Sequence, residues 1–242
     1  MVDKTMLKAQ KKFGIEELEE LSGSAMAKMT PSQFGQLLKD YFTIQNVYSA
    51  AIKEMSTKLE ILDSEFHFRY KRNPIHNIQT RLKSPQSIFN KLLKKGLDSD
   101  FKTVTEKITD IAGIRVICQY IDDIYTIADL LTKQDDVTVV SVSDYIKRPK
   151  ENGYRSLHIV VNIPVFFSDR KENVNVEIQI RTIAMDYWAS LEHELKYKNP
   201  ETVPAEIKAK LLECAETIAE TDKKMQDIYR TLSKLEDSKK DS

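Results

Sequence analysis

Apolar residues recur at alternating spacings of four and three along two stretches, one near each end of the chain. The first stripe runs from Phe34 to Phe66 with one polar interruption at Gln45, and the second runs from Ile207 to Leu235 with an interruption at Thr221. This heptad-like spacing predicts two long helices, the second of which begins just after Pro204. Such stripes usually pack within one chain, but two of them flanking one core also suit a homo-oligomer.

Between the stripes the pattern changes to that of strands. Four segments are predicted to be strands: Ile114 to Gln119, Val137 to Val142, Ser156 to Ile163 and Val174 to Arg181. Helical segments follow the first strand, at Asp122 to Lys133, and the last strand, at Thr182 to Lys196. A short helix precedes them all, with Ser84 as its N-cap, Pro85 as its first residue and Gly96 as its stop. We therefore predict an α/β (α+β) fold with a central mixed β-sheet of about five strands, flanked by helices, and with long N- and C-terminal helices.

Composition limits the class of protein. The chain has 242 residues, of which 41% are hydrophobic and 31% charged, as is typical of a globular protein in water. No run approaches the roughly 18 apolar residues of a membrane-spanning helix, and the first residues lack a secretory signal. The six glycines form neither a P-loop nor a dinucleotide-binding motif. Cys118 and Cys214 lie far apart in apolar surroundings, so we expect both to be reduced core residues of a cytoplasmic protein.

The overall charge balance conceals a local excess of cations. The 37 Lys and Arg residues equal the 37 Asp and Glu residues, yet no acid lies between Glu65 and Asp98. Eight basic residues fall in that interval: Arg69, Lys71, Arg72, Arg81, Lys83, Lys91, Lys94 and Lys95. Because like charges repel, this cluster favours a polyanionic partner. The alternative is a solvated basic face that acids elsewhere in the fold balance.

The last predicted strand separates its side chains into two chemical kinds. From Val174 to Arg181 aliphatic and polar residues alternate, so one face is wholly aliphatic and the other wholly polar. The strands at 114–119 and 156–163 alternate in a similar way. If the three strands are neighbours, Arg115, His158, Glu177 and Gln179 share one surface, which suits a phosphate-and-metal site. A simply solvated polar face is the alternative.

The short helix carries groups that suit a bound phosphate chain. Ser87 lies in its first turn, where free backbone N–H groups attract anions, and Lys91 follows one turn later on the same face. Arg81 and Lys83 precede the helix. The arrangement fits a triphosphate held by side chains, and it favours binding of a nucleotide or a nucleic acid.

Two other patterns are interpreted as structural. Asp122 and Asp123 stand at a predicted strand-to-helix turn, where capping of the helix explains them better than metal binding does. The helix from Thr182 carries large apolar residues that we expect to lie in the core: Ile183, Tyr187, Trp188, Leu191 and Leu195.

Three motifs resemble the alarmone synthetase domain of the RelA/SpoT family: Thr109 to Val116 (TDIAGIRV), Asn152 to His158 (NGYRSLH) and Glu177 to Thr182 (EIQIRT). The resemblance covers roughly residues 70–200 and keeps the order and approximate spacing of the motifs. The chain is similar to the short, stand-alone members, the small alarmone synthetases. None of its four histidines is followed by Asp, as the family's hydrolase domain would require, and the sequence before residue 70 is too short to hold that domain.

The resemblance implies a division of the chain, a reaction and an assembly. We expect an N-terminal extension (residues 1–30), a (p)ppGpp synthetase domain that includes the long N-terminal helix (31–200), and a C-terminal helix for oligomerisation (201–242). The implied reaction transfers the β,γ-pyrophosphate of ATP to the ribose 3′-OH of GDP or GTP, giving ppGpp or pppGpp and AMP in the bacterial stringent response. Mg²⁺ is the implied cofactor, and a cytoplasmic homotetramer without membrane contact is the implied assembly.

The resemblance also implies roles for individual residues. Asp110 and Glu177 are the implied catalytic residues and metal ligands, and Glu177 ligates the ion, accepts the hydroxyl proton, or both. The implied ATP-binding residues are Arg81 and Arg115, which sandwich adenine, and Lys83, Ser87 and Lys91, which hold the phosphates. The implied GDP/GTP-binding residues are Tyr154, which stacks on guanine, Lys150 and His158, which contact phosphates, and Gln179. Asp186 departs from some short members, which have Asn there, and this leaves the acceptor preference open.

Two rival functions remain open at this stage. One is a non-catalytic nucleotide or single-stranded RNA binding module, which the basic cluster and the nearby aromatic residues Phe66, Phe68 and Tyr70 allow. The two acids Asp110 and Glu177 argue against it, because anion binding does not require carboxylates in the groove. The other is a different nucleotidyl or phosphoryl transferase, which a leaving product other than AMP would indicate.

Overall fold

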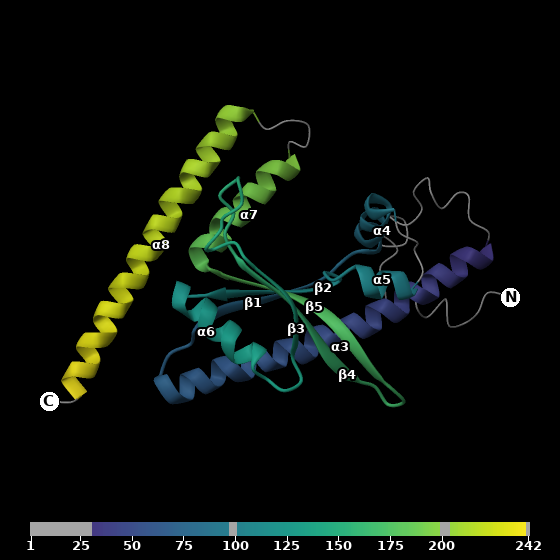
Figure 1. The fold of residues 1–242 in the computed structure, drawn as a ribbon, viewed down its shortest axis with the longest axis horizontal. Coiled ribbons are helices and arrows are strands. Elements are labelled where there is room, and N and C mark those ends of the chain that lie inside the picture. Colours follow the sequence, from purple (N-terminus) through teal and green to yellow (C-terminus); the bar gives the residue numbers. More distant parts are fainter. Residues whose placement is uncertain (1–30, 97–100, 199–203, 241–242) are drawn as a thin grey trace.

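The computed structural model describes residues 31–96, 101–198 and 204–240, and the predicted N-terminal extension at 1–30 lies outside these described residues. In chain order the elements are α3 (Pro31–Tyr70), β1 (Ile75–Leu82), α4 (Pro85–Lys95), α5 (Phe101–Lys107), β2 (Ala112–Cys118), α6 (Ile121–Thr132), β3 (Thr138–Asp144), β4 (Leu157–Phe166), β5 (Lys171–Thr182), α7 (Ile183–Lys198) and α8 (Ala205–Lys240). Figure 1 shows α3 along one side of the sheet and α7 and α8 on the other. The two predicted long helices are therefore present.

The strands form one five-stranded mixed sheet in the order β1-β2-β5-β4-β3. β2 and β5 run parallel, and the other neighbouring pairs are antiparallel. The register places Gln179 opposite both Arg115 and His158. Because residues directly opposite each other share a face, these three side chains lie on one surface with Glu177, which is two residues before Gln179. The predicted fold class and the predicted polar sheet face are confirmed.

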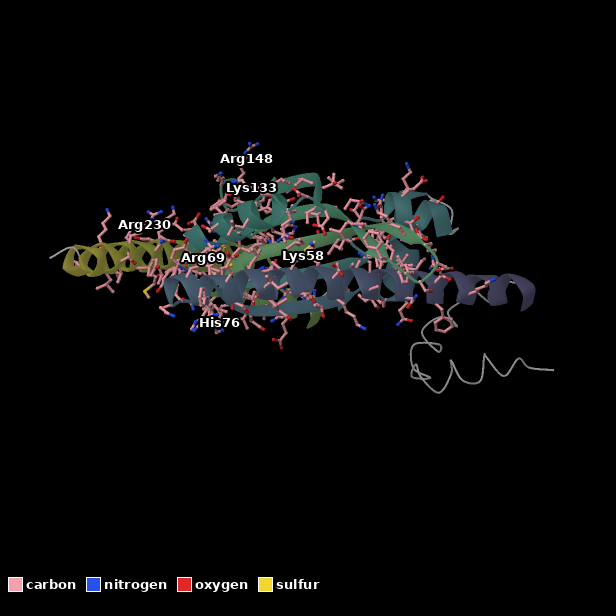
Figure 2. All side chains as sticks on the ribbon, turned by 90° about the horizontal axis from the view of Figure 1, so that it is seen from below. Lys58, Arg69, His76, Lys133, Arg148 and Arg230 are labelled. Atoms are coloured by element: carbon pink, nitrogen blue, oxygen red, sulfur yellow. The ribbon has the colours of Figure 1, made fainter. Side chains whose placement is uncertain are left out.

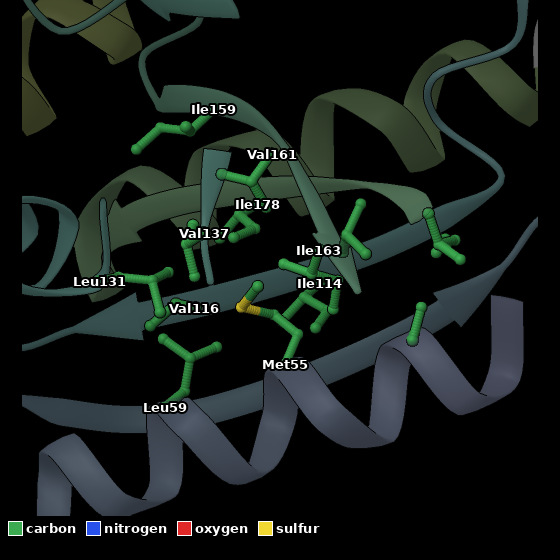
Figure 3. Close-up of a cluster of buried hydrophobic side chains, with 14 of the residues drawn as sticks. Met55, Leu59, Ile114, Val116, Leu131, Val137, Ile159, Val161, Ile163 and Ile178 are labelled. Carbon is green, nitrogen blue, oxygen red and sulfur yellow. The ribbon is translucent and has the colours of Figure 1, made fainter. Parts of the chain in front are cut away.

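Helices α3 and α6 cover the aliphatic face of the sheet. Met55 and Leu59 of α3 and Leu131 of α6 are fully buried, and Figure 3 shows them packed toward Ile114 and Ile178 of the sheet. Buried and partly exposed positions alternate along β4 and most of β5, as a sheet with one covered face requires. Burial of this apolar surface is the main driving force for folding.

The sequence analysis placed four strands and several helices, but it did not place β1 or α5. In β1, a register irregularity between Ile75 and Asn77 adds a residue to the strand. Ile75 and Ile78, three residues apart, both pack on the core as a result. This spacing hides the period of two by which a strand is recognised, and the remaining positions of β1 are largely exposed. α5 has only seven residues, too few for a clear helical period.

The prediction that the apolar stripe of α7 lies in the core was wrong for four of its five residues. Trp188 is buried, and its Nε1 atom donates a hydrogen bond to the carbonyl oxygen of Leu211 on α8 (3.0 Å). The other four side chains are exposed: Ile183, Tyr187, Leu191 and Leu195. α7 directs Trp188 and Ala189 toward α8, so the stripe lies on a different side of the helix.

α8 contacts the rest of the chain through a mostly polar face. Ala215, Asp222 and Gln226 are its buried residues, and the Thr182 hydroxyl donates a hydrogen bond to Asp222 (2.6 Å). The predicted apolar stripe lies next to this face and is largely exposed, with Met225, Ile228, Leu232 and Leu235 each at least half accessible. Cys118 is buried as predicted, whereas Cys214 is exposed on α8, so the predicted core position of Cys214 was wrong.

The paired acids before α6 act structurally, as the sequence predicted. The backbone N–H of Tyr120 donates to the carboxylate of Asp123 (3.2 Å), which caps the helix. Asp122 forms an ion pair with Arg230 of α8 (2.7 Å), and Asp123 forms one with Arg72. The start of α6 is thereby tied both to α8 and to the segment that follows α3.

The basic cluster is partly balanced by acids from the same chain. The ion pairs are Arg69 with Glu65, Arg72 with Asp123, and both Lys83 and Lys91 with Asp110. Figure 2 shows Arg69 near one end of α3 and Arg148 projecting away from the ribbon. Within the described ranges, no helix is both long and apolar enough to cross a membrane.

Replacement of Leu59 by Ala should destabilise the fold strongly. Leu59 is fully buried beneath the sheet, so the change removes apolar contacts and leaves a cavity, with an expected loss of about 2–5 kcal/mol. Ile61→Ala on the same helix is the control, because Ile61 is 60% exposed. Urea unfolding of both variants measures the difference, and equal losses would contradict the packing described here.

Candidate nucleotide-binding site

A cavity of about 290 Å³ opens on the polar face of the sheet, where β1, β2 and β5 lie side by side. Its lining residues are Gln79, Thr80, Arg81, Lys83, Asp110, Gly113, Ile114, Arg115, Glu177 and Gln179. Six of the eleven residues predicted for the site are therefore brought together. Gly113 pairs with Arg81 on one side and with Glu177 on the other. An arginine and a carboxylate thus flank a position without a side chain, which leaves space between them.

Asp110 lies between two lysines at one end of this cavity. Its carboxylate forms ion pairs with Lys83 from the end of β1 (2.6 Å) and with Lys91 from α4 (2.7 Å). Burial acts to raise the pKa of Asp110, but the hydrogen bonds and charges of the two lysines outweigh it, so the pKa is lowered. Asp110 therefore remains a carboxylate at neutral pH, with two ammonium groups beside it.

The start of α4 has the predicted capping geometry. The Ser84 side chain accepts a hydrogen bond from the backbone N–H of Ser87 (3.3 Å) and donates one to the Ser87 hydroxyl (2.9 Å). Ser87 itself does not line the cavity described above. The helix nevertheless supplies Lys91, whose ammonium group reaches Asp110.

The predicted acceptor residues form a second group that joins the cavity at Glu177. The Tyr154 hydroxyl lies 2.8 Å from Nε2 of His158, and Nδ1 of His158 lies 3.6 Å from Oε1 of Glu177. The ammonium group of Lys150 stands over the rings of Tyr145 and Tyr154, at 4.6 and 4.9 Å from their centroids. Lys150, Tyr154 and His158 therefore lie together, beside the cavity rather than among its lining residues.

Glu177 receives hydrogen-bonding groups at both of its oxygens. The Nε2 group of Gln179 donates to Oε2 (3.1 Å), and His158 faces Oε1. The neighbouring His158 ring is the main cause that lowers the pKa of Glu177, against an opposing effect of burial. Burial raises the pKa of the Tyr154 phenol. At neutral pH Glu177 is therefore a carboxylate, and Tyr154 keeps its proton.

Arg181 and Asp186 complete the site, and the site prediction did not include Arg181. Arg181 is almost wholly buried, and it donates to Tyr154, Gln179 and Asp186. Burial lowers the pKa of its guanidinium group. Asp186 also forms an ion pair with Arg115 (3.5 Å), so it connects the arginine of the cavity to Arg181. The strand alternation of Glu177, Gln179 and Arg181 was the available signal for including Arg181.

The two carboxylates of the cavity are too few for a metal that only protein side chains hold, but they suit Mg²⁺, which also binds substrate phosphates. Among the described residues, no group of three or more His, Cys, Asp or Glu side chains could hold a metal ion. Mg²⁺ commonly binds through one or two carboxylates together with substrate phosphates. Asp110 and Glu177 provide such carboxylates, and they lie close enough for Asp110 to act on the pKa of Glu177.

An α+β domain with arginines, lysines and two carboxylates gathered around a cavity on one sheet face has the features of a nucleotide-binding transferase. Residues 80–202 match the family model described as the region found in RelA / SpoT proteins. The chain belongs to this family, and its resemblance to the stand-alone small alarmone synthetases is confirmed.

Named relatives from Bacillus subtilis (strain 168) cover most of the chain. GTP pyrophosphokinase YwaC is 44% identical over 194 residues, which are 80% of this chain and 92% of the relative. GTP pyrophosphokinase YjbM is 36% identical over 181 residues, or 75% and 84% of the two chains. The crystal structure of small alarmone synthetase 2 from Bacillus subtilis superposes with a TM-score of 0.73 at 43% identity, covering 79% of this chain and 99% of that one. Small alarmone synthetase 1, bound to its product pppGpp, gives a TM-score of 0.70 at 35% identity, with 76% and 93% covered.

Loss of Lys83 should raise the pKa of Asp110. Lys83→Met removes one of the two cations that favour the ionised form of Asp110. A carboxyl whose pKa is lower in the folded than in the unfolded protein stabilises the fold at pH values above its unfolded pKa. This stabilisation is lost as the pH falls through the folded pKa. The variant should therefore be less stable than the wild type near neutral pH, and the difference should narrow toward about pH 3.

Two measurements check this expectation. Carboxyl ¹³C NMR follows the titration of Asp110 itself, and urea unfolding across the same pH range follows stability. Lys94→Met is the matched control, because Lys94 is an exposed lysine of α4, the helix that follows Lys83. An unchanged Asp110 titration in Lys83→Met would show that the ion pair does not control this carboxylate.

Proposed function

We propose that this chain is a GTP pyrophosphokinase that makes (p)ppGpp by moving the β,γ-pyrophosphate of ATP to the ribose 3′-OH of GDP or GTP. The observation that carries the proposal is that one cavity contains Asp110, Glu177, Arg81 and Arg115, and that Glu177 also contacts the group formed by His158 and Tyr154. A donor and an acceptor nucleotide could therefore meet at Glu177. The names of the Bacillus subtilis relatives support the same reaction.

On the donor side, the arginines and lysines have separate tasks. Arg81 and Arg115 line the cavity with planar guanidinium groups, which stack on a flat base such as adenine in a way that Lys cannot. Lys83 and Lys91, held beside Asp110, compensate the charge of the triphosphate. Ser87 lies in the first turn of α4, where it contributes to phosphate binding through the helix N-terminus.

On the acceptor side, the tyrosine, the lysine and the histidine form one continuous surface. Tyr154 provides an aromatic ring for guanine, Lys150 provides a cation over that ring, and His158 connects Tyr154 to the catalytic carboxylate. Gln179 bonds to the same carboxylate and belongs to this side of the site.

The reaction forms one bond and breaks one. The 3′-oxygen of the acceptor bonds to the β-phosphorus of ATP, the bond from that phosphorus to the α-phosphate oxygen breaks, and AMP leaves. Glu177 accepts the hydroxyl proton, a role that its lowered pKa permits because it is ionised at neutral pH. Asp110 and Glu177 would hold Mg²⁺, which when bound supplies positive charge to the donor phosphates. The protein otherwise acts by aligning the two nucleotides.

We further propose that the protein works as a cytoplasmic homo-oligomer, and specifically as a homotetramer. Exposed apolar residues on α7 and on α8 support the assembly: Tyr187, Leu191 and Leu195, and Met225, Ile228, Leu232 and Leu235. Contact between copies would remove this apolar surface from water. Helix α8 is then the oligomerisation segment of the chain, within the predicted region 201–242.

The first test incubates the purified chain with Mg²⁺, ATP and GDP or GTP, and resolves the nucleotides by anion exchange. We expect a more highly charged guanosine product together with equimolar AMP, and we expect no product when Mg²⁺ is chelated. Glu177→Gln should lower the rate at least about 100-fold, because general base catalysis contributes roughly that much or more. ATP binding should remain within about twofold by calorimetry, since Gln keeps the shape of the side chain.

Three results would count against the proposed reaction. Wild-type turnover in Glu177→Gln would remove the assigned base, and a leaving product other than AMP would indicate another phosphoryl or nucleotidyl transferase. Binding of ATP or single-stranded RNA without any transfer would favour a binding module.

The assembly is tested by light scattering. We expect a mass several times that of the 28.0 kDa chain, and we expect Ile228→Glu combined with Leu232→Glu to reduce it. Lys234→Glu is the control, because this residue is exposed on the far side of α8. A monodisperse wild-type monomer would refute the assembly.

A further inference from the structure

Arg181 occupies a junction between the donor and acceptor halves of the site. Its Nη2 group donates to the Tyr154 hydroxyl (2.9 Å) and to Oε1 of Gln179 (2.8 Å), and its Nη1 group donates to Asp186 (3.3 Å). Only 2% of the residue is exposed. A charge that is buried this completely requires partners, and here the partners are polar residues of the site itself.

The chemistry of arginine makes these contacts directional. A guanidinium group has five N–H donors and no acceptor, so each partner must present an oxygen lone pair toward it. Gln179 therefore turns its carbonyl oxygen to Arg181 and its NH₂ group to Oε2 of Glu177, at 3.1 Å. The orientation of the Gln179 amide is thus set by Arg181 rather than by Glu177 alone.

The same reasoning applies to Tyr154 and His158. Because the Tyr154 oxygen accepts from Arg181, its own O–H is free to donate to Nε2 of His158, 2.8 Å away. A neutral imidazole with Nε2 as acceptor carries its proton on Nδ1. That Nδ1–H faces Oε1 of Glu177, at 3.6 Å.

Two series of contacts thus begin at Arg181, one through Gln179 and the other through Tyr154 and His158. They end at the two carboxylate oxygens of Glu177. We propose that Arg181 is a positioning residue: it sets the Gln179 amide and the Nδ1–H tautomer of His158, so that both present donors to Glu177. The proposal rests on the proposed function only in making Glu177 the general base. Held from both sides, the carboxylate has one orientation toward the acceptor hydroxyl, which is what alignment of a proton transfer requires.

The tautomer of His158 is measured directly by ¹⁵N NMR of the histidine rings, with His158→Gln used to assign its signals. We expect the Nδ1–H form in the wild type. Tyr154→Phe removes only the hydroxyl and keeps the aromatic ring, and Arg181→Lys replaces the planar fork by a single ammonium group that cannot serve Tyr154, Gln179 and Asp186 together. Both variants should lose the preference for the Nδ1–H form.

Kinetics provide the second readout. In Arg181→Lys we expect kcat to fall about tenfold, with the KM for ATP within about twofold, as loss of one or two orienting hydrogen bonds implies. The double variant with Tyr154→Phe should fall less than the product of the single effects, because the two residues act in the same series of contacts. The control is Arg72→Lys. Arg72 is also a half-buried arginine that donates to a tyrosine hydroxyl, that of Tyr229 (2.8 Å), but it lies away from the site. It should keep wild-type kcat.

The outcomes separate this inference from the proposed function. An Nε2–H tautomer in the wild type, or an unchanged tautomer in Tyr154→Phe, overturns the positioning role whether or not the enzyme turns over. Independent effects in the double variant, or an equal loss of kcat in Arg72→Lys, overturn it as well. If Arg181→Lys does not fold, Tyr154→Phe decides by itself. Absence of any guanosine product from the wild type refutes the proposed function. The NMR result then decides by itself whether Arg181 sets the tautomer of His158.

Discussion

Burial of the aliphatic face of β5 against α3 is the constraint on which the site depends. Val176, Ile178 and Ile180 are fully buried, and a shift of the strand by one residue would expose all of them. The same register that buries them places Glu177, Gln179 and Arg181 on the opposite face. The positions of Glu177, the proposed general base, and of the groups around it are therefore fixed by hydrophobic packing on the other side of the sheet.

The second constraint is electrostatic, because the cavity holds two acids among its arginines and lysines. Asp110 lies between the ammonium groups of Lys83 and Lys91, whereas Glu177 lies beside the His158 ring and accepts a hydrogen bond from the Gln179 amide. The two acids are therefore kept ionised by different means. Lysines beside Asp110 offer positive charge to a phosphate chain, whereas hydrogen-bond donors orient Glu177 without surrounding it by cations. This difference matches an acid that manages phosphate charge and one that accepts a proton.

The sequence predicted the parts of the fold that follow a regular period, and it missed those that do not. The alternation in β5 identified the polar face correctly, and the motifs around Asp110 and Tyr154 contain residues that the structure brings together at or beside one cavity on that face. β1 was not placed, because the bulge near Asn77 interrupts its period. The exposed position of Tyr187 was not foreseen either, because an apolar stripe on a helix has the same spacing whether it meets a core or another copy. Which residues stabilise one another across the site, as Arg181 does, depends on side-chain directions that spacing does not contain.

Helix α8 links its own packing to the geometry of the site at the end of β5. Thr182, the residue after Arg181, accepts a hydrogen bond at its hydroxyl oxygen from the backbone N–H of Met185, which caps α7, and donates to the buried Asp222 of α8. Burial raises the pKa of Asp222, so burying this carboxyl beside Thr182 costs less free energy when the carboxyl is protonated. Because Asp186 lies in the first turn of α7 and bonds Arg181, the cap that α8 supports also positions a partner of Arg181. The same helix therefore carries the exposed apolar stripe on one side and, on the other, a contact that supports Asp186 and Arg181.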